Sequence, residues 1–228
     1  MTTTNFFQEK PEIGNSLSYG WDTMKRYFLP LFLVVIVGAI IQTPFQMFSK
    51  HTQEGYTSIA VLVEFLALAY WLLFLPIISY SSDLLFVRAV RNEALDLKDI
   101  IIGFKNYLNI ILAHLLATAL IGISFVALII PGIIVGCRLA FVSYLVMDKG
   151  MDPIEAVETS WKMTKGHTWR IFFLYLASFL IFILGLCLLI VGIFPAMMWI
   201  QASFASLYEA VLDDRKDLFP TLTVPETE

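Results

Sequence analysis

Apolar residues in this chain are grouped into long continuous runs separated by short polar segments. A run of about 18 or more apolar residues is long enough to cross the hydrocarbon core of a bilayer as an α-helix. The second run is expected to continue as a helix through 82–91, outside the bilayer. The pattern predicts six spans, at 27–48, 57–80, 108–130, 132–147, 169–190 and 196–212.

Two pairs of these spans are separated only by uncharged turn residues. Pro131-Gly132 and the sequence Gly-Ile-Phe-Pro at 192–195 each predict a tight turn within a helical hairpin. We therefore expect an all-α, polytopic membrane bundle with one integral domain over 1–228. The segment 1–26 and the tail 213–228 are expected to lie in or at the cytoplasm.

Composition agrees with a lipid-facing surface. Hydrophobic residues make up 58% of the 228 residues and charged residues 15%, against about 45–50% and about 25% in soluble domains. A uniformly buried soluble bundle would not need six such runs. The two cysteines, Cys137 and Cys187, lie inside apolar runs without a spacing motif, so neither a disulfide nor a metal site is expected. The polar first thirty residues do not match a cleavable signal peptide.

Basic residues predict the orientation. Of the 15 Lys and Arg residues, 13 fall before the first span, after the sixth, or in the segments after the second and fourth spans. Only Lys50 falls on the other face, and Arg138 lies within the fourth span. Because short loops rich in Lys and Arg stay cytoplasmic, both termini are expected in the cytoplasm and the loop at 50–56 outside. The net charge of −4 gives no reason to expect a nucleic-acid partner.

Three segments of similar pattern stand directly ahead of the first, third and fifth spans. Each has apolar residues at helical spacing, then an aromatic residue (Trp21, Phe104 or Trp161), then a turn that contains lysine. The clearest is 153–165, for which Asp152 is a suitable N-cap. We expect amphipathic helices at the cytoplasmic interface, anchored by these aromatic residues, and a unit of one such helix and two spans that repeats three times. The alternative is three unrelated interfacial helices that share the pattern.

Three stretches resemble a family of prokaryotic six-helix membrane proteins related to the membrane domain attached to some glycerophosphodiester phosphodiesterases. They are DLKDIIIGFKNY at 96–107, IIPGIIVGCRLAFVSYLVMD at 129–148 and IEAVETSWKMTKGHTWRIF at 154–172. The resemblance implies a six-helix fold in a prokaryotic inner membrane. It implies no activity, because the phosphodiesterase catalytic domain of those relatives is not matched here.

No catalytic signature occurs in the sequence. There is no H-E-x-x-H, G-x-S-x-G, P-loop or Cys-x-x-Cys, and we expect no enzymatic activity, metal or cofactor. The adjacent carboxylates Asp213 and Asp214 in the tail are expected to be solvated.

Ionisable side chains within the spans are the remaining candidates for a functional site. Glu64 and Arg138 each lie about seven residues, or about 10 Å, from the outer ends of their predicted helices. A charge there costs at least about 2.5 kcal/mol unless it is paired or hydrated. Either the two pair or share a polar pocket, or Arg138 extends to the interface while Glu64 is protonated or interfacial. For His114 and Asp83, near the cytoplasmic end, a structural hydrogen bond is the simpler interpretation.

These observations favour a non-enzymatic accessory or scaffold protein that acts through contacts with the bilayer or with another membrane protein. The alternative is a small transporter or lipid-handling protein with a polar site near Glu64 and Arg138. A polar cavity within the bundle would favour transport, and a continuous apolar groove on the lipid face would favour the accessory role.

Overall fold

The structure is a computed structural model that describes residues 12–51, 58–187 and 189–219. Within these ranges the chain is built from helices and contains no strand. This confirms the predicted all-α class.

Short connections join the helices, and two of the helices are of the 3₁₀ type. In chain order they are α1 (Ile13–Arg26), α2 (Phe28–His51), α3 (Ser58–Leu73), α4 (Leu75–Val90), the 3₁₀ helix η3 (Leu97–Asn106), α5 (Tyr107–Ala127), α6 (Ile129–Arg138), α7 (Val142–Asp148), α8 (Pro153–Met163), α9 (Thr168–Cys187), α10 (Leu189–Asp214) and the 3₁₀ helix η4 (Lys216–Leu218).

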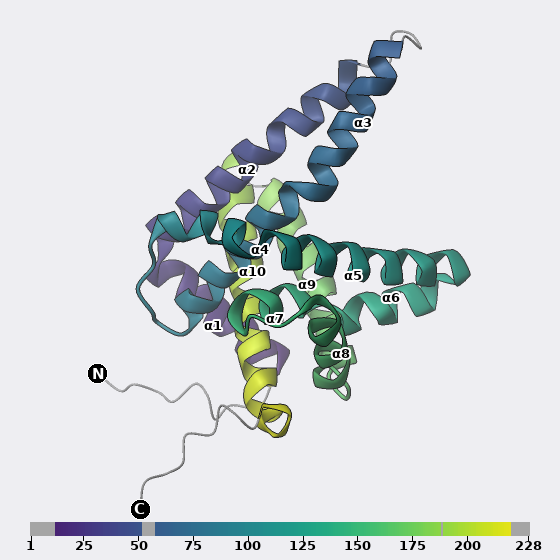
Figure 1. The fold of residues 1–228 in the computed structure, drawn as a ribbon. Helices are drawn as coiled ribbons and strands as arrows, with labels where there is room; N and C mark the ends of the chain where they lie inside the picture. The colour runs from purple at the N-terminus through teal and green to yellow at the C-terminus, as the bar shows by residue number, and fades with distance from the viewer. Residues whose placement is uncertain (1–11, 52–57, 188, 220–228) are drawn as a thin grey trace, which may run out of the picture.

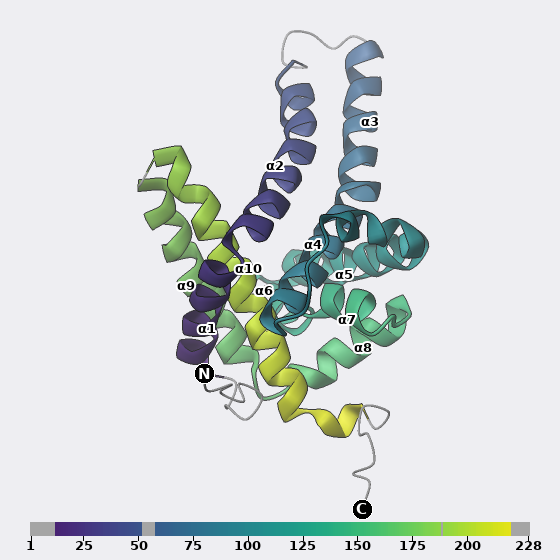
Figure 2. The same cartoon turned by 90° about the vertical axis from the view of Figure 1, so that its left-hand side faces the viewer.

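Three helical hairpins leave a common body in different directions. They are formed by α2 with α3, α5 with α6, and α9 with α10. In Figure 1 the α2–α3 hairpin points upward and the α5–α6 hairpin points to the right. Figure 2 shows the α9–α10 hairpin to the left of α2–α3. The hairpins therefore do not run side by side as they would in a simple six-helix bundle.

The core of the body lies where α4, α7 and α10 meet. Phe86, Leu145 and Tyr208, one from each helix, are completely buried. The ring of Tyr208 stacks on Tyr144 at 5.0 Å between centroids and packs edge-on against Phe141 at 5.6 Å. Aromatic side chains bury more apolar area than other residues, so this junction is a major source of the body's packing energy.

Among the residues that the structure describes, four helical segments are long and apolar enough to cross a membrane: Glu64–Val90, Lys98–Ala127, Ile129–Asp148 and Thr168–Cys187. They correspond to the predicted second to fifth spans. A fifth arises if α1 and the Phe28–Ile41 part of α2, which meet at 96°, form one bent span. The count of four to five agrees with a multi-pass membrane protein, and six spans stay a prediction.

The turn between α5 and α6 is not the predicted Pro131-Gly132. It lies at Leu128, which is extended with φ −165° and ψ 149°, and Pro131 falls inside the first turn of α6. Proline is tolerated there because the first N–H groups of a helix have no intrahelical acceptor. Gly132 lies inside α6 and is not the turn residue that the sequence predicts. A Cβ at this position would lie 2.5 Å from the Phe125 ring, so glycine allows the two arms to approach.

Two predicted spans are broken helices. The second divides into α3 and α4 at Phe74, and the fourth divides into α6 and α7 at residues 139–141. The predicted turn at 192–195 is wrong as well, because α10 begins at Leu189 and contains Pro195 in its interior.

The three predicted interfacial segments are α1, η3 and α8. Their aromatic residues, Trp21, Phe104 and Trp161, are 41%, 44% and 43% exposed, so each ring is only partly covered by protein. The second segment is a 3₁₀ helix rather than an α-helix. Asp152 is the N-cap residue of α8, but its side chain makes no cap; it accepts from Asn109 Nδ2 at 3.4 Å instead. The interfacial anchoring and the threefold repeat stay predictions.

Candidate functional site

Glu64 and Arg138 lie on different hairpins. Glu64 is exposed on α3 and has no hydrogen-bond or ion-pair partner among the described residues. Arg138 ends α6, donates from Nη1 to the backbone carbonyl of Trp161 at 3.3 Å, and lies over the Trp161 ring at 4.9 Å from its centroid.

The structure does not bring Glu64 and Arg138 together, and no ion pair joins them within the described ranges. Equal depth brings two residues together only when their hairpins run side by side, whereas α3 and α6 point in different directions (Figure 1). Arg138 instead contacts the helix that follows the fourth span. The pairing hypothesis therefore has no support from the contacts of either residue.

Asp83 and His114, in contrast, belong to one polar cluster inside the body. Asp83, on α4, interacts with the Ser143 hydroxyl of the neighbouring α7. The phenols of Tyr80, Tyr144 and Tyr175 lie within electrostatic range of its carboxylate. The cluster thus gathers groups from α4, α7 and α9 about 10 Å inside the helix end at Val90.

His114 connects this cluster to a cavity. Its ring packs edge-on to Tyr80 at 6.2 Å, and it lines a cavity of about 220 Å³ between α2, α4, α5 and α10. Ser82 and Gln201 also line this cavity. Gln201 Oε1 is buried without a hydrogen-bond partner among the described residues. A cavity of this size holds several water molecules, so a small polar solute can be accommodated beside His114.

An ion-pair network that sequence reasoning missed lies at the end of the body. The Arg91 guanidinium contacts both carboxylate oxygens of Asp148, at 2.5 and 2.8 Å, and Glu209 Oε1 at 2.6 Å. Lys149 Nζ lies 3.2 Å from Asp148, and the Tyr208 hydroxyl donates to Asp148 at 3.0 Å. The available signal was that Arg91, Asp148 and Glu209 lie at or near the predicted cytoplasmic ends of three different helices.

Burial lowers the pKa of Arg91, but hydrogen bonds and charge attraction from Asp148 and Glu209 outweigh burial and raise that pKa above its usual value. Arg91 is therefore charged at every pH at which the protein is folded. The network fixes α4, α7 and α10 relative to one another below the Asp83 cluster.

The α8–α9 connection is tied to the end of α10 through His167. Arg170 can only donate, and its Nη1 lies 2.7 Å from His167 Nδ1, so Nδ1 accepts and Nε2–H donates to Asp214 at 3.0 Å. Burial lowers the pKa of His167, as do Arg170 and Arg215, against the opposite effect of Asp214. Asp214 is therefore paired with a neutral imidazole and is not simply solvated as predicted. Asp213 is paired as well, with Lys216 Nζ at 2.5 Å.

Comparison of the chain with protein-family models, with curated proteins and with solved structures finds no match. The relation to the membrane domain of glycerophosphodiester phosphodiesterases therefore stays an expectation from the sequence. The described part of the chain is all-helical and has four to five candidate membrane-spanning helices, which fits a multi-pass membrane protein.

Proposed function

We propose that the protein is a small, non-enzymatic membrane transporter that binds a small cation, a proton included, at Asp83. The observation that carries this proposal is the environment of that carboxylate. Asp83 lies within the candidate span Glu64–Val90 and forms no ion pair in the described part of the chain. An intramembrane carboxylate without a basic partner is costly to keep ionised, and a bound cation or proton removes that cost.

The groups around Asp83 suit a cation more than an anion. Carboxylate and hydroxyl oxygens are the donors that hard cations prefer, and phenol rings attract organic ammonium ions through their faces. The carboxylate of Asp83 and the nearby hydroxyl of Ser143 are oxygen donors of this kind, and the phenols of Tyr80, Tyr144 and Tyr175 lie within electrostatic range of the carboxylate. The neighbouring cavity beside His114 gives a solute room to approach.

Cation binding can be tested with purified protein in vesicles and in detergent. The probes are protons, sodium, potassium and tetramethylammonium, measured by flux into vesicles and by the shift of the thermal unfolding midpoint. We expect at least one probe to cross faster than in empty vesicles and to raise the midpoint. Asp83→Asn keeps the size and hydrogen bonding of the side chain but loses its charge, and should remove both effects.

Glu64→Gln is the matched control, because it removes an exposed, unpaired carboxylate from the same candidate span. It should leave flux and midpoint shift unchanged. The proposal is wrong if none of the four probes has an effect on the unmodified protein, or if Asp83→Asn and Glu64→Gln behave alike.

The second candidate is the accessory or scaffold role. It is favoured by the broad exposed apolar surface on α3 and α9, where Phe65 is 66% exposed and Phe179 61%. Such surface faces lipid or a partner protein. Purification in a stable complex with another membrane protein, together with failure of all four cation probes, would favour this role.

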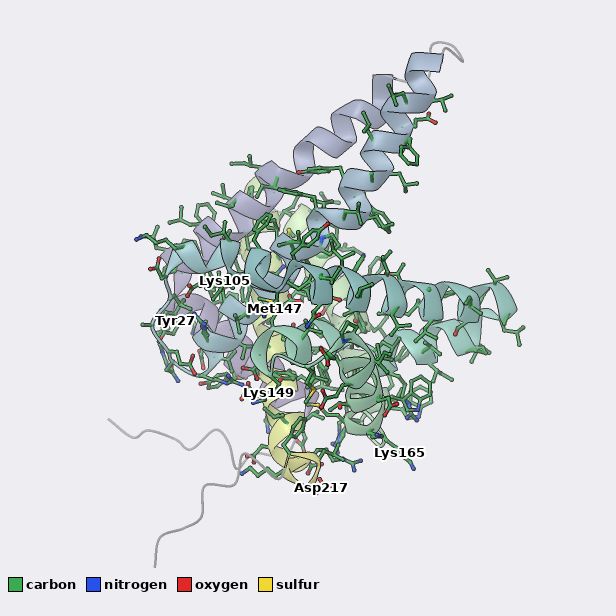
Figure 3. The ribbon with its side chains drawn as sticks, in the orientation of Figure 1. Tyr27, Lys105, Met147, Lys149, Lys165 and Asp217 are labelled. Carbon is green, nitrogen blue, oxygen red and sulfur yellow. The ribbon has the colours of Figure 1, made fainter. Side chains whose placement is uncertain are left out.

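We further propose six spans, a threefold repeat of helix and hairpin, and both termini in the cytoplasm of a prokaryotic cell. The order of elements supports the repeat, since α1, η3 and α8 each precede a hairpin. Figure 3 supports the orientation, because Lys149 and Lys165, both assigned to cytoplasmic segments, lie at the end of the molecule opposite the far ends of α2 and α3. The prokaryotic inner membrane rests on the family resemblance.

Cysteine labelling tests this topology. In a background of Cys137→Ala and Cys187→Ala, single cysteines at Thr52 and Thr223, both outside the described residues, should react from opposite sides of the membrane. An impermeant reagent applied outside should modify Thr52→Cys at least tenfold faster than Thr223→Cys. Equal labelling from outside would overturn the orientation.

A further inference from the structure

An apolar groove with a cation among its lining residues runs along the outside of α6 and α9. Its volume is about 600 Å³, within the range of about 300–1,000 Å³ usual for small-molecule sites. Ile130 and Trp169 are 71% and 72% exposed, so the groove opens to the surroundings of the protein. Its lining residues include Ile130, Ile134, Trp169, Phe172, Thr168 and Arg138.

Arg138 is the charged member of this lining and is held in a fixed position. Its backbone carbonyl accepts from Ser160 Oγ at 2.8 Å and from Thr164 Oγ1 at 3.2 Å. Its guanidinium lies over the Trp161 ring and donates to the Trp161 carbonyl in the last turn of α8. The side chain is therefore preorganised by α8 and not free to swing into solvent.

The guanidinium nevertheless has unused capacity for a ligand. Arg138 forms no ion pair within the described ranges. Its Nε is buried and has no hydrogen-bond acceptor there. A cation without a counter-charge beside an apolar groove is complementary to a molecule that joins an anion to a hydrocarbon chain. Guanidinium groups bind phosphate oxygens well because their N–H donors are planar and diverge in a fixed fork.

We infer that the α6–α9 groove binds one anionic phospholipid, with an acyl chain between Ile134 and Phe172 and the headgroup phosphate at Arg138. The distance along α6 from Ile130 to Arg138 is about 12 Å, enough for a substantial part of a chain. Trp169, which also lines the groove and lies in the first turn of α9, is the residue type enriched at headgroup depth. This site is separate from the Asp83 cluster, and neither proposal depends on the other.

Native mass spectrometry of the full chain in mild detergent measures binding of individual lipids. The probes are a palmitoyl-oleoyl phosphatidylglycerol, the phosphatidylcholine with the same chains, and glycerol 3-phosphate without chains. We expect phosphatidylglycerol to bind at least tenfold more tightly than phosphatidylcholine, and glycerol 3-phosphate not to bind measurably. Arg138→Gln should weaken phosphatidylglycerol binding at least tenfold.

Lys162→Gln is the matched control. Lys162 follows Trp161 in α8 and is 60% exposed, and it does not line the groove, so its replacement should change affinity by less than twofold. Ile134→Trp, which fills the groove and keeps Arg138, should also weaken binding, and it carries the test if Arg138→Gln does not fold. Equal losses in Arg138→Gln and Lys162→Gln, equal binding of the two lipids, or full binding by Ile134→Trp would each overturn the proposal.

Discussion

Replacing Arg91 with glutamine is expected to lower the free energy of unfolding by about 3–5 kcal/mol. The side chain of Arg91 is 20% exposed, and those of its partners Asp148 and Glu209 are 5% exposed each. Without the guanidinium, two buried carboxylates face each other with only Lys149 to compensate them. Reversible unfolding in mixed micelles would measure the loss.

A double replacement distinguishes this mechanism from simple loss of packing. Glu209→Gln added to Arg91→Gln removes one of the unpaired charges, so the double variant should be more stable than the sum of the two single losses predicts. Arg88→Gln, one turn earlier on α4, should cost about 1 kcal/mol, because among the described residues Arg88 pairs with Asp99 alone. Strict additivity of the Arg91 and Glu209 losses would contradict a coupled network.

Replacing Gly20 with alanine is expected to destabilise the protein by about 1–3 kcal/mol, through overpacking between α1 and α10. A Cβ at Gly20 would lie 2.7 Å from the backbone nitrogen and 2.9 Å from the Cα of Ser203, neither of which can move aside alone. The same contact region holds the hydrogen bond from Trp199 Nε1 to the Leu17 carbonyl at 2.8 Å. The loss should appear as a lower thermal unfolding midpoint.

Gly14→Ala, on the same helix, provides a control of opposite sign. A Cβ at Gly14 meets nothing within 4 Å, and alanine favours a helix over glycine by about 1 kcal/mol. Gly14→Ala should therefore stabilise the protein or leave it unchanged. If both replacements raise the unfolding midpoint, the close approach of α1 and α10 at Gly20 is absent in solution.

The long apolar helices could be predicted closely from the sequence. The predicted spans at 108–130 and 169–190 correspond to α5 and α9, because continuous apolar runs of this length have one stable conformation in lipid. The turns are less predictable, because proline is common in turns but also occurs in helices: Pro131 lies in the first turn of α6 and Pro195 in the interior of α10. The observed turn residue, Leu128, has no distinguishing side chain.

The candidate site was predictable only in part, because the sequence indicates where a residue lies along its helix but not how the helices are arranged. The sequence predicts Asp83 and His114 near the cytoplasmic ends of their helices, and both lie close to Tyr80 in the structure. Counting residues from helix ends failed for Glu64 and Arg138, since depth says nothing about which way a hairpin points. The contacts of Arg91 with Asp148 and Glu209 depend on how three helix ends meet, and no local pattern in the sequence encodes that.

The apolar far end of the α5–α6 hairpin has a consequence for biosynthesis. Val126 is 90% exposed there, and Ile129 and Ile130 are exposed as well. No Asp, Glu, Lys or Arg occurs between Lys105 and Arg138, so this hairpin can enter the bilayer without moving any charge through hydrocarbon.

The segment that joins α2 to α3, in contrast, carries Glu54 close after Lys50, and each such charge costs about 2.5–3.5 kcal/mol at the membrane centre. In the proposed topology the first hairpin has to carry these charges across the membrane, whereas the second can partition into lipid directly.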